Sequence, residues 1–221
     1  PGHSSAASDV YKRQMLDYES LLRWSENQWE KSILPSLSEF ISIEALSPGF
    51  EPKWEEKGEL SATLDLFQNW ADVQGIDGLE SHRFKLDGRT PLLIIKVKGS
   101  LPGEILFYSH LDKQPSKPDL WSDGLSPFVG KRRGEWLYGR GSIDDGYGGY
   151  LCISAIKALQ AHGMDHPSAT FLIETCEESG SYDLPAYLDH CTPYLGNADL
   201  VVVMDSGGPD YDHIWNTDGL R

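Results

Sequence analysis

A glycine-rich segment that ends in two adjacent aspartates constrains the folding of this chain more than any other feature. The segment reads Gly139-Arg140-Gly141-Ser142-Ile143-Asp144-Asp145-Gly146 and leads into an apolar segment with helical spacing. Glycine permits turns that other residues adopt only with strain. A turn that carries two carboxylates to the start of a helix has few purposes other than binding cations, so we expect Asp144 to bridge two metal ions.

Similar side chains follow apolar runs elsewhere in the sequence. Predicted strands at 104–109, 169–175 and 200–204 are followed by His110 and Asp112, by Glu177 and Glu178, and by Asp205. In open α/β sheets, ligands bind at the carboxyl ends of the strands. We therefore expect these side chains and Asp144 to converge at one edge of a sheet.

Strands and helices alternate along the chain, which predicts the α/β class with a mixed, largely parallel sheet flanked by helices. Helical spacing of apolar residues predicts helices over 15–46, divided at Pro35, and over 58–73, 147–162 and 184–190. Hairpins are predicted around Asp87-Gly88-Arg89 and around Arg133-Gly134-Glu135, in addition to the three strands named above.

The composition of the sequence indicates which classes of partner and which cellular compartment to expect. A formal net charge of −15 disfavours nucleic acid and anionic membrane surfaces, which select clustered Lys and Arg, so we expect neither as a partner. No apolar run approaches the length of a spanning helix, and no cleavable signal pattern opens the chain. Cys152, Cys176 and Cys191 lack C-x-x-C spacing, which predicts reduced, mostly buried thiols. These features favour the cytoplasm.

Residues 1–14 need separate treatment, because they resemble the in-frame translation of an adapter used to prepare sequencing libraries. We interpret them as an artefact and exclude them from the fold prediction. The native part is then expected to be residues 15–221, with Met15 as a candidate start.

The order of the motifs resembles a family of two-zinc metallopeptidases. That family includes glutamate carboxypeptidase, aminoacylase, succinyl-diaminopimelate desuccinylase and the carnosine-type dipeptidases. The resemblance runs from about Ser109 to Asp205. Two segments look most like the carnosine-type branch, His110-Leu111-Asp112-Lys113-Gln114-Pro115 and Leu137-Tyr138-Gly139-Arg140-Gly141-Ser142-Ile143-Asp144-Asp145.

The resemblance implies a role for each matching residue. His110 and Asp205 would be terminal ligands of one zinc ion, Glu178 a ligand of the other, and Asp144 the bridge. Glu177 would be the general base for the water that attacks a peptide or amide carbonyl. Asp112 would accept a hydrogen bond from His110 and fix its ring. The family also suggests a cis peptide between Asp144 and Asp145. Manganese or cobalt would accept the same donors as zinc.

The resemblance also implies parts that this chain does not include. The family carries a further ligand histidine near its carboxyl terminus and an inserted lid domain for dimerisation and substrate closure. Residues 15–221 are therefore expected to be the amino-terminal part of a catalytic domain, inactive alone, from a homodimeric protein. The family often has lysine after the paired aspartates, where this chain has Gly146-Tyr147-Gly148-Gly149, which leaves the subfamily open.

Several alternatives stay open at the level of sequence. The shared motifs fit a dipeptidase, which we prefer, and also a deacylase of N-acyl amino acids. A non-catalytic metal-binding relative is a second alternative, and an α/β domain whose acids merely solvate its surface is a third. We interpret Glu174 as a surface residue and Asp183 as a loop charge.

Overall fold

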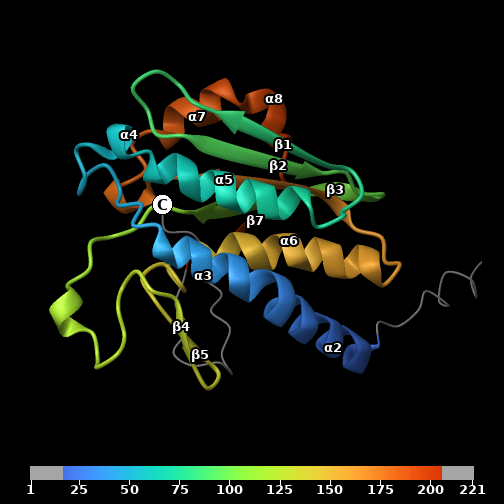
Figure 1. Cartoon of the computed structure of the whole chain (residues 1–221). Coiled ribbons are helices and arrows are strands. Elements are labelled where there is room, and N and C mark those ends of the chain that lie inside the picture. The colour runs from blue at the N-terminus through green and yellow to red at the C-terminus, as the bar shows by residue number, and fades with distance from the viewer. Residues whose placement is uncertain (1–16, 206–221) are drawn as a thin grey trace, which may run out of the picture.

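The computed structural model describes residues 17–205, and its centre is a five-stranded mixed sheet (Figure 1). The strands lie in the order β1-β2-β6-β3-β7. Strand β1 pairs antiparallel with β2 and β2 antiparallel with β6, whereas β6 with β3 and β3 with β7 are parallel. The strand bounds are Leu79–Phe84 for β1, Leu92–Val97 for β2, Leu101–His110 for β3, Pro167–Glu174 for β6 and Leu200–Val203 for β7.

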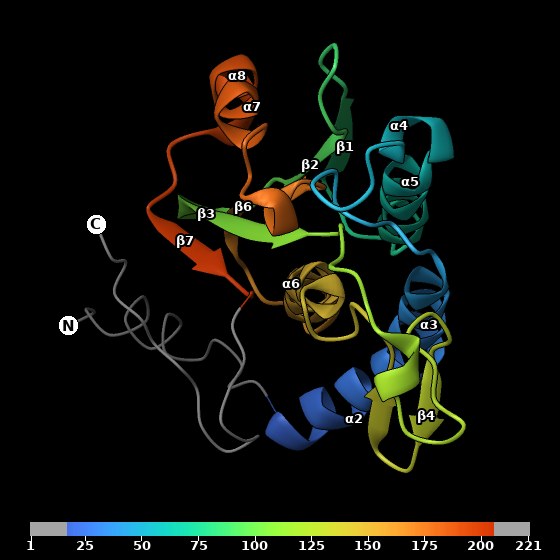
Figure 2. The ribbon, with the colours of Figure 1, turned by 90° about the vertical axis from the view of Figure 1, so that its left-hand side faces the viewer.

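Helices cover both faces of this sheet, as the α/β prediction requires (Figure 2). One face carries α3 (Leu34–Ser42), α5 (Glu59–Asp72) and α6 (Gly146–Ala161), and the other carries α7 (Leu184–His190) and α8 (Thr192–Leu195). Helix α2 (Tyr18–Gln28) lies along α6, and the short α4 (Trp54–Lys57) precedes α5. The predicted α/β class with a mixed sheet is confirmed, and parallel pairing is confined to β6, β3 and β7.

Strand β2 shows why both faces had to be covered. Its side chains alternate between the faces, since successive residues of a strand point to opposite sides. Leu93 and Ile95 pack with α3, α5 and α6, whereas Leu92 and Ile94 pack with Tyr187 of α7. All four leucine and isoleucine side chains are buried. A strand without exposed positions reads as a continuous apolar run, as this sequence does.

The first predicted helix is divided near Pro35, as expected, but by a local change in helix type. Residues Trp29–Ile33 form a π-helical segment, η1, between α2 and α3. Pro35 lies in the first turn of α3. Proline has no N–H to donate and its ring clashes with the carbonyl four residues earlier. The wider π turn before Pro35 accommodates this, and the backbone N–H of Leu34 bonds to Trp29 O instead.

The remaining predicted elements are present, with shifts at their ends. The first hairpin consists of β1 and β2, which flank the predicted turn at Asp87-Gly88-Arg89. The second consists of β4 (Lys131–Arg133) and β5 (Trp136–Tyr138), which form a separate two-stranded sheet. Two short 3₁₀ segments, η2 (Pro118–Leu120) and η3 (Glu177–Ser179), were not predicted.

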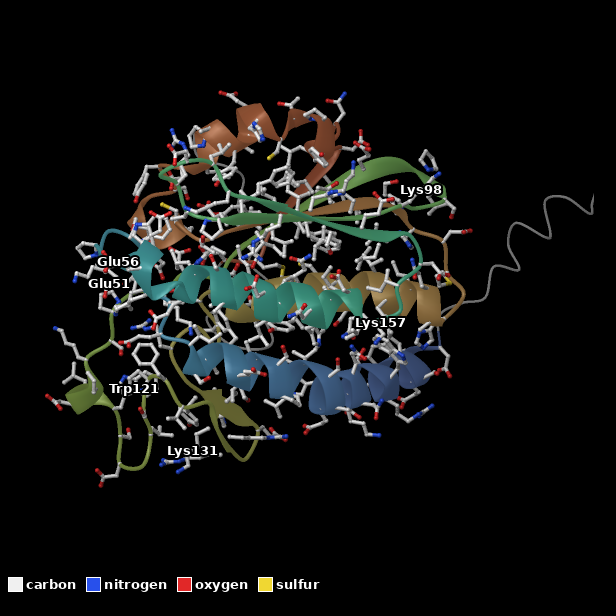
Figure 3. The ribbon with its side chains drawn as sticks, turned by 45° about the horizontal axis from the view of Figure 1, so that its top comes forward. Glu51, Glu56, Lys98, Trp121, Lys131 and Lys157 are labelled. Atoms are coloured by element: carbon white, nitrogen blue, oxygen red, sulfur yellow. The ribbon has the colours of Figure 1, made fainter. Side chains whose placement is uncertain are left out.

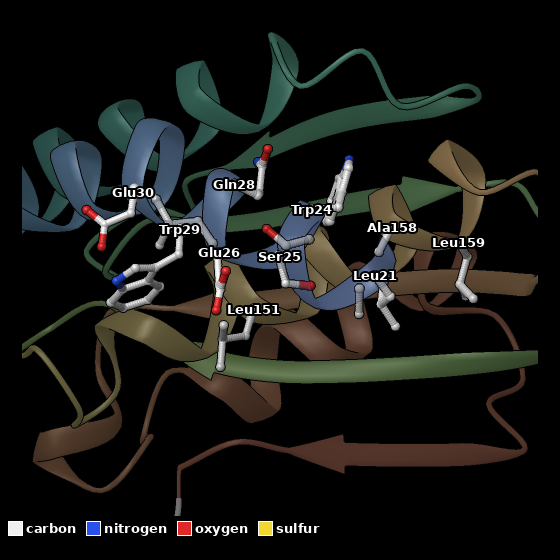
Figure 4. A pocket seen from close by; sticks show the side chains of 13 residues that line it. Leu21, Trp24, Ser25, Glu26, Gln28, Trp29, Glu30, Leu151, Ala158 and Leu159 are labelled. Carbon is white, nitrogen blue, oxygen red and sulfur yellow. The ribbon is translucent and has the colours of Figure 1, made fainter. Parts of the chain in front are cut away.

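The described residues include the three cysteines but not the predicted adapter segment. Cys152, Cys176 and Cys191 are free and buried, as expected. Among residues 17–205, no helix is long and apolar enough to cross a membrane. A groove of about 680 Å³ lies between α2 and α6 (Figure 4), and its lining contains none of the predicted site residues.

Candidate metal centre

The parallel part of the sheet brings the ends of three strands together. Strand β3 ends at His110, which pairs with Glu174 at the end of β6, and Tyr108 pairs with Val203 at the end of β7. The arrowheads of β3 and β7 point the same way in Figure 2. Parallel neighbours end at one edge, so the residues that follow them meet there. This is the convergence that the sequence predicted.

His110 lies at the centre of a ring of carboxylates. Its ring is fully buried. The Nε2 atom lies 3.3 Å from Asp144 Oδ1, 3.6 Å from Asp205 Oδ2 and 3.7 Å from Glu177 Oε2. Burial lowers the pKa of His110, but its interactions with the carboxylates of Asp112, Asp144 and Asp205 outweigh burial and raise it overall. A cluster with this excess of negative charge requires a proton or a cation at its centre.

Asp112 connects His110 to the paired glutamates. Its Oδ1 lies 3.4 Å from His110 Nδ1 and accepts a hydrogen bond from the backbone N–H of Glu177 at 3.2 Å. Its Oδ2 accepts from the backbone N–H of Glu178 at 3.0 Å. Asp112 is fully buried, so its carboxylate is held in one place by these partners. The backbone carbonyl of Asp112 lies 3.2 Å from the same His110 Nδ1 atom. Asp112 therefore orients the imidazole through both its carboxylate and its carbonyl, and the carboxylate also orients the turn that carries Glu177 and Glu178.

The two aspartates of the glycine segment have different environments. The peptide bond between Asp144 and Asp145 is cis, as the family resemblance implies. The Asp144 side chain is 41% exposed and faces His110. Asp145 is fully buried, and its Oδ2 accepts the backbone N–H of His110 at 3.2 Å. Asp144 is thus free to bind a ligand, whereas Asp145 anchors the end of β3.

Glu178 lies close to the same group of carboxylates. Burial raises the pKa of Glu178 to about 7, against a hydrogen bond from Gln114 and in concert with the charge of Asp144. The Gln114 bond, Nε2 to Glu178 Oε2, measures 2.6 Å. Burial likewise raises the pKa of Asp145 to about 7. A bound metal ion would favour the ionised form of nearby carboxyl groups such as these.

The donor atoms suit a zinc ion. Two sets of side chains have ligand atoms within 4.8 Å of one another, His110 with Asp144 and Asp205, and His110 with Glu177 and Glu178. Two of these atoms, His110 Nε2 and Glu178 Oε1, are buried and have no hydrogen-bond partner in the described part of the chain. Buried polar atoms are almost always paired. Imidazole nitrogen and carboxylate oxygen are both common zinc ligands, so an ion would satisfy these atoms.

Two glycines after Asp145 have a packing role. A Cβ atom at Gly148 would lie 2.9 Å from Met204 Cβ, and one at Gly149 would lie 2.8 Å from Phe67 Cζ. Both distances are shorter than side chains tolerate. The start of α6 therefore packs directly against α5 and the segment before Asp205.

Two sequence interpretations were wrong. Glu174 is buried rather than at the surface, and its Oε1 accepts hydrogen bonds from Tyr108 at 2.6 Å and Ser181 at 2.8 Å. Asp183 is buried rather than a loop charge, and it accepts from Arg89 and from the backbone N–H of Thr90. Isolated acids are usually exposed. Both exceptions depend on partners distant in sequence, which no local pattern indicates.

Sequence reasoning also missed Lys113. This side chain is fully buried, although lysine is almost never so. The only local signal is its position between Asp112 and Gln114, two residues that contact the glutamate turn.

Comparison with known proteins identifies a peptidase family and similar dipeptidases. The sequence model of peptidase family M20/M25/M40 matches residues 106–217. Human Beta-Ala-His dipeptidase is 33% identical over 188 residues, which cover 80% of this chain and 36% of that protein. Cysteinylglycine-S-conjugate dipeptidase from Corynebacterium striatum is 29% identical, over 79% of this chain and 37% of that protein.

Solved structures support the fold. The crystal structure of human carnosine dipeptidase 1 superposes with a TM-score of 0.68 at 23% identity, covering 85% of this chain and 41% of that one. The metallo-carboxypeptidase Sso-CP2 from Sulfolobus solfataricus also gives 0.68, at 24% identity, over 81% of this chain and 38% of that one. The chain spans just over a third of the length of the curated relatives it matches.

Proposed function

Because the chain belongs to peptidase family M20/M25/M40, we propose that the complete protein containing it is a dipeptidase that uses two zinc ions. The carrying observation is the buried Nε2 of His110, which has no hydrogen-bond partner among residues 17–205 and lies 3.3 Å from Asp144 Oδ1 and 3.6 Å from Asp205 Oδ2. In this proposal His110 and Asp205 bind one zinc ion, Glu178 binds the other, and Asp144 bridges both.

The side chains divide the chemistry among them. Bound zinc would lower the pKa of water and polarise the substrate carbonyl. Glu177, one third exposed, faces the same space as His110 Nε2, and burial raises its pKa. A carboxylate with a raised pKa accepts a proton more readily near neutral pH, so Glu177 is the general base. It takes the proton of the attacking water and passes it to the leaving amine.

Asp112 does not touch the reacting atoms in this scheme. It keeps the His110 ring oriented and fixes the backbone of Glu177 relative to it. Mutation of such a partner of a metal ligand typically lowers metal affinity or activity by about 10- to 100-fold.

Dipeptides are the preferred substrates because two similar proteins carry dipeptidase names. Deacylation of N-acyl amino acids is the second candidate. It is favoured by 32% identity over 130 residues to a succinyl-diaminopimelate desuccinylase from Sphingopyxis alaskensis, covering 58% of this chain and 31% of that protein. Both reactions attack an amide carbonyl, so the residues named above serve either.

Two measurements on the purified full-length protein test the proposal. Release of amino acids from a dipeptide panel is compared with release from N-acyl amino acids at equal concentration, and bound metal is determined by mass spectrometry. Faster dipeptide turnover with two zinc ions per chain supports the proposal. Faster deacylation selects the second candidate. Bound metal without turnover identifies a non-catalytic relative, and no bound metal excludes the whole assignment.

The proposal extends to the setting of the enzyme. Manganese or cobalt would be accepted by the same donors, and metal analysis of protein from its native host distinguishes them from zinc. A homodimer is expected for the full-length protein, which light scattering tests. The buried, free cysteines suit a reducing compartment, so the cytoplasm is the proposed location.

A further inference from the structure

Lys113 is the one fully buried lysine among the described residues, and three backbone carbonyls accept hydrogen bonds from its side chain. Its Nζ donates to Phe40 O at 2.7 Å, to Ile43 O at 2.6 Å and to Ile41 O at 3.3 Å. These carbonyls lie at the carboxyl end of α3. The last carbonyls of a helix lack partners within it and carry partial negative charge. Lys113 therefore caps α3 from another part of the chain.

The backbone of Lys113 is attached to the same region. Its N–H donates to Ala45 O, and its carbonyl accepts the N–H of Ser47, both at 3.0 Å. Ser47 in turn shares a 2.6 Å hydrogen bond with Ser179, which follows the paired glutamates. The loop after α3 is thus joined on one side to Lys113 and on the other to the glutamate turn.

The glycine segment lies directly on the Lys113 side chain. A Cβ atom at Gly141 would be 2.8 Å from Lys113 Cε and 2.9 Å from Phe40 Cε1. Gly141 also has a φ of +85°, which favours glycine. Lys113 Nζ lies 4.0 Å from the Phe40 ring centroid, a distance typical of a cation over an aromatic face. The glycine segment, which ends at Asp144 and Asp145, therefore packs at Gly141 against both Lys113 and Phe40.

We propose that Lys113 is a positioning residue for the metal centre, which fixes the segment carrying His110 and Asp112 relative to the segment carrying Asp144. This inference rests on the proposed function, because it assigns Lys113 a role in metal binding. Lys113 is only three residues from His110, and its alkyl chain contacts the glycine segment, so a displacement of Lys113 moves ligands from two segments at once.

The test uses the full-length protein and the variant Lys113→Met, which keeps an unbranched side chain but removes the Nζ donor from the carbonyls of Phe40, Ile41 and Ile43. Zinc affinity is measured by competition with a chelator, and the visible spectrum of the cobalt-loaded protein reports ligand geometry. We expect zinc affinity to fall by about 10- to 100-fold, the range found for partners of metal ligands, and the cobalt spectrum to change.

Lys157→Met is the matched control. Lys157 also ties helices together, because its Nζ donates to Gln28 Oε1 at 3.1 Å and Gln74 Oε1 at 2.9 Å (Figure 3). Within the described residues, its side chain makes no hydrogen bond to His110, Asp144, Glu178 or Asp205. This variant should lose thermal stability while keeping wild-type zinc affinity and cobalt spectrum.

The outcomes separate this inference from the proposed function. Wild-type protein that binds no zinc contradicts the proposed function. Wild-type protein that binds zinc, together with unchanged zinc affinity and spectrum in Lys113→Met, shows that Lys113 is only a helix cap. If Lys113→Met does not fold, Lys113→Gln replaces it. Its shorter amide reaches fewer carbonyls, so zinc affinity should fall about threefold or more, and wild-type affinity would overturn the inference.

Discussion

The carboxylate of Asp112 accepts a hydrogen bond from the backbone N–H of Glu177 at 3.2 Å while its Oδ1 lies 3.4 Å from His110 Nδ1. The proposed general base and the proposed ligand are therefore oriented by the same buried side chain. A carboxylate that serves two groups couples their positions, so its loss should affect metal binding and turnover together.

Asp112→Asn tests this coupling. Each carboxylate oxygen of Asp112 accepts a backbone N–H, from Glu177 or from Glu178. Asparagine replaces one of these oxygens with an NH₂ group, which cannot accept, so at least one hydrogen bond is lost. We expect zinc affinity and kcat each to fall about tenfold or more. Asp183→Asn is the control, because Asp183 is a buried carboxylate that accepts from Arg89 and Thr90 instead. Equal zinc affinity in the wild type and Asp112→Asn would refute the coupling.

Glu177→Gln tests the general base. The amide has nearly the same shape but cannot accept a proton at neutral pH. General bases contribute about 10²- to 10⁴-fold to rate, so kcat should fall by that factor while the zinc content stays near the wild-type value. Turnover is followed by amino acid release under saturating substrate. Unchanged turnover would remove Glu177 from the mechanism, and loss of zinc would make it a ligand instead.

His110→Ala tests the centre of the site. Removing the imidazole leaves the carboxylates without the nitrogen ligand, so bound zinc per chain should decrease after dialysis. His166→Ala is the matched control. His166 is also buried, but it bonds to Gln160 and Pro167 rather than to the carboxylate group. Full zinc stoichiometry in His110→Ala would argue against a ligand role.

Glu174→Gln tests how much the buried carboxylate of Glu174 lowers the thermal stability of the protein. Burial raises the pKa of Glu174 above its usual value of 4.5. The folded state then binds more protons than the unfolded state, so the free energy of unfolding falls as pH rises through this range and stays low above it. Gln keeps a carbonyl oxygen for Tyr108 and Ser181 but has no charge. The gain in Tm over wild type should therefore be larger at pH 8 than at pH 5.

This comparison is made in metal-free buffer, where the other titrating groups are common to both proteins. Glu135→Gln, in the exposed turn between β4 and β5, is the control and should show the same Tm difference at both pH values. A Tm difference for Glu174→Gln that does not change with pH would show that the Glu174 carboxyl ionises in the folded state as it does in the unfolded state, so that burial does not raise its pKa.

Local patterns in the sequence predicted much of the site. His110 follows an apolar run, Glu177 and Glu178 follow another, and Asp205 follows a third, because a buried strand must be apolar and polar groups return where it ends. The glycine segment indicated a turn before a helix, which the structure has at α6. These signals are local, so they can be recognised in the sequence without knowledge of the fold.

Only the tertiary structure decided which of these groups meet and which acids are buried. Strand β6 inserts between β2 and β3, although it follows both in the sequence, and this order brings His110, Asp112 and the glutamate turn together. The same packing buries Glu174, Asp183 and Lys113 against distant partners. Burial depends on what covers a residue from elsewhere in the chain, so periodicity and spacing fixed the ends of the strands, while the sheet order fixed the neighbours of each side chain.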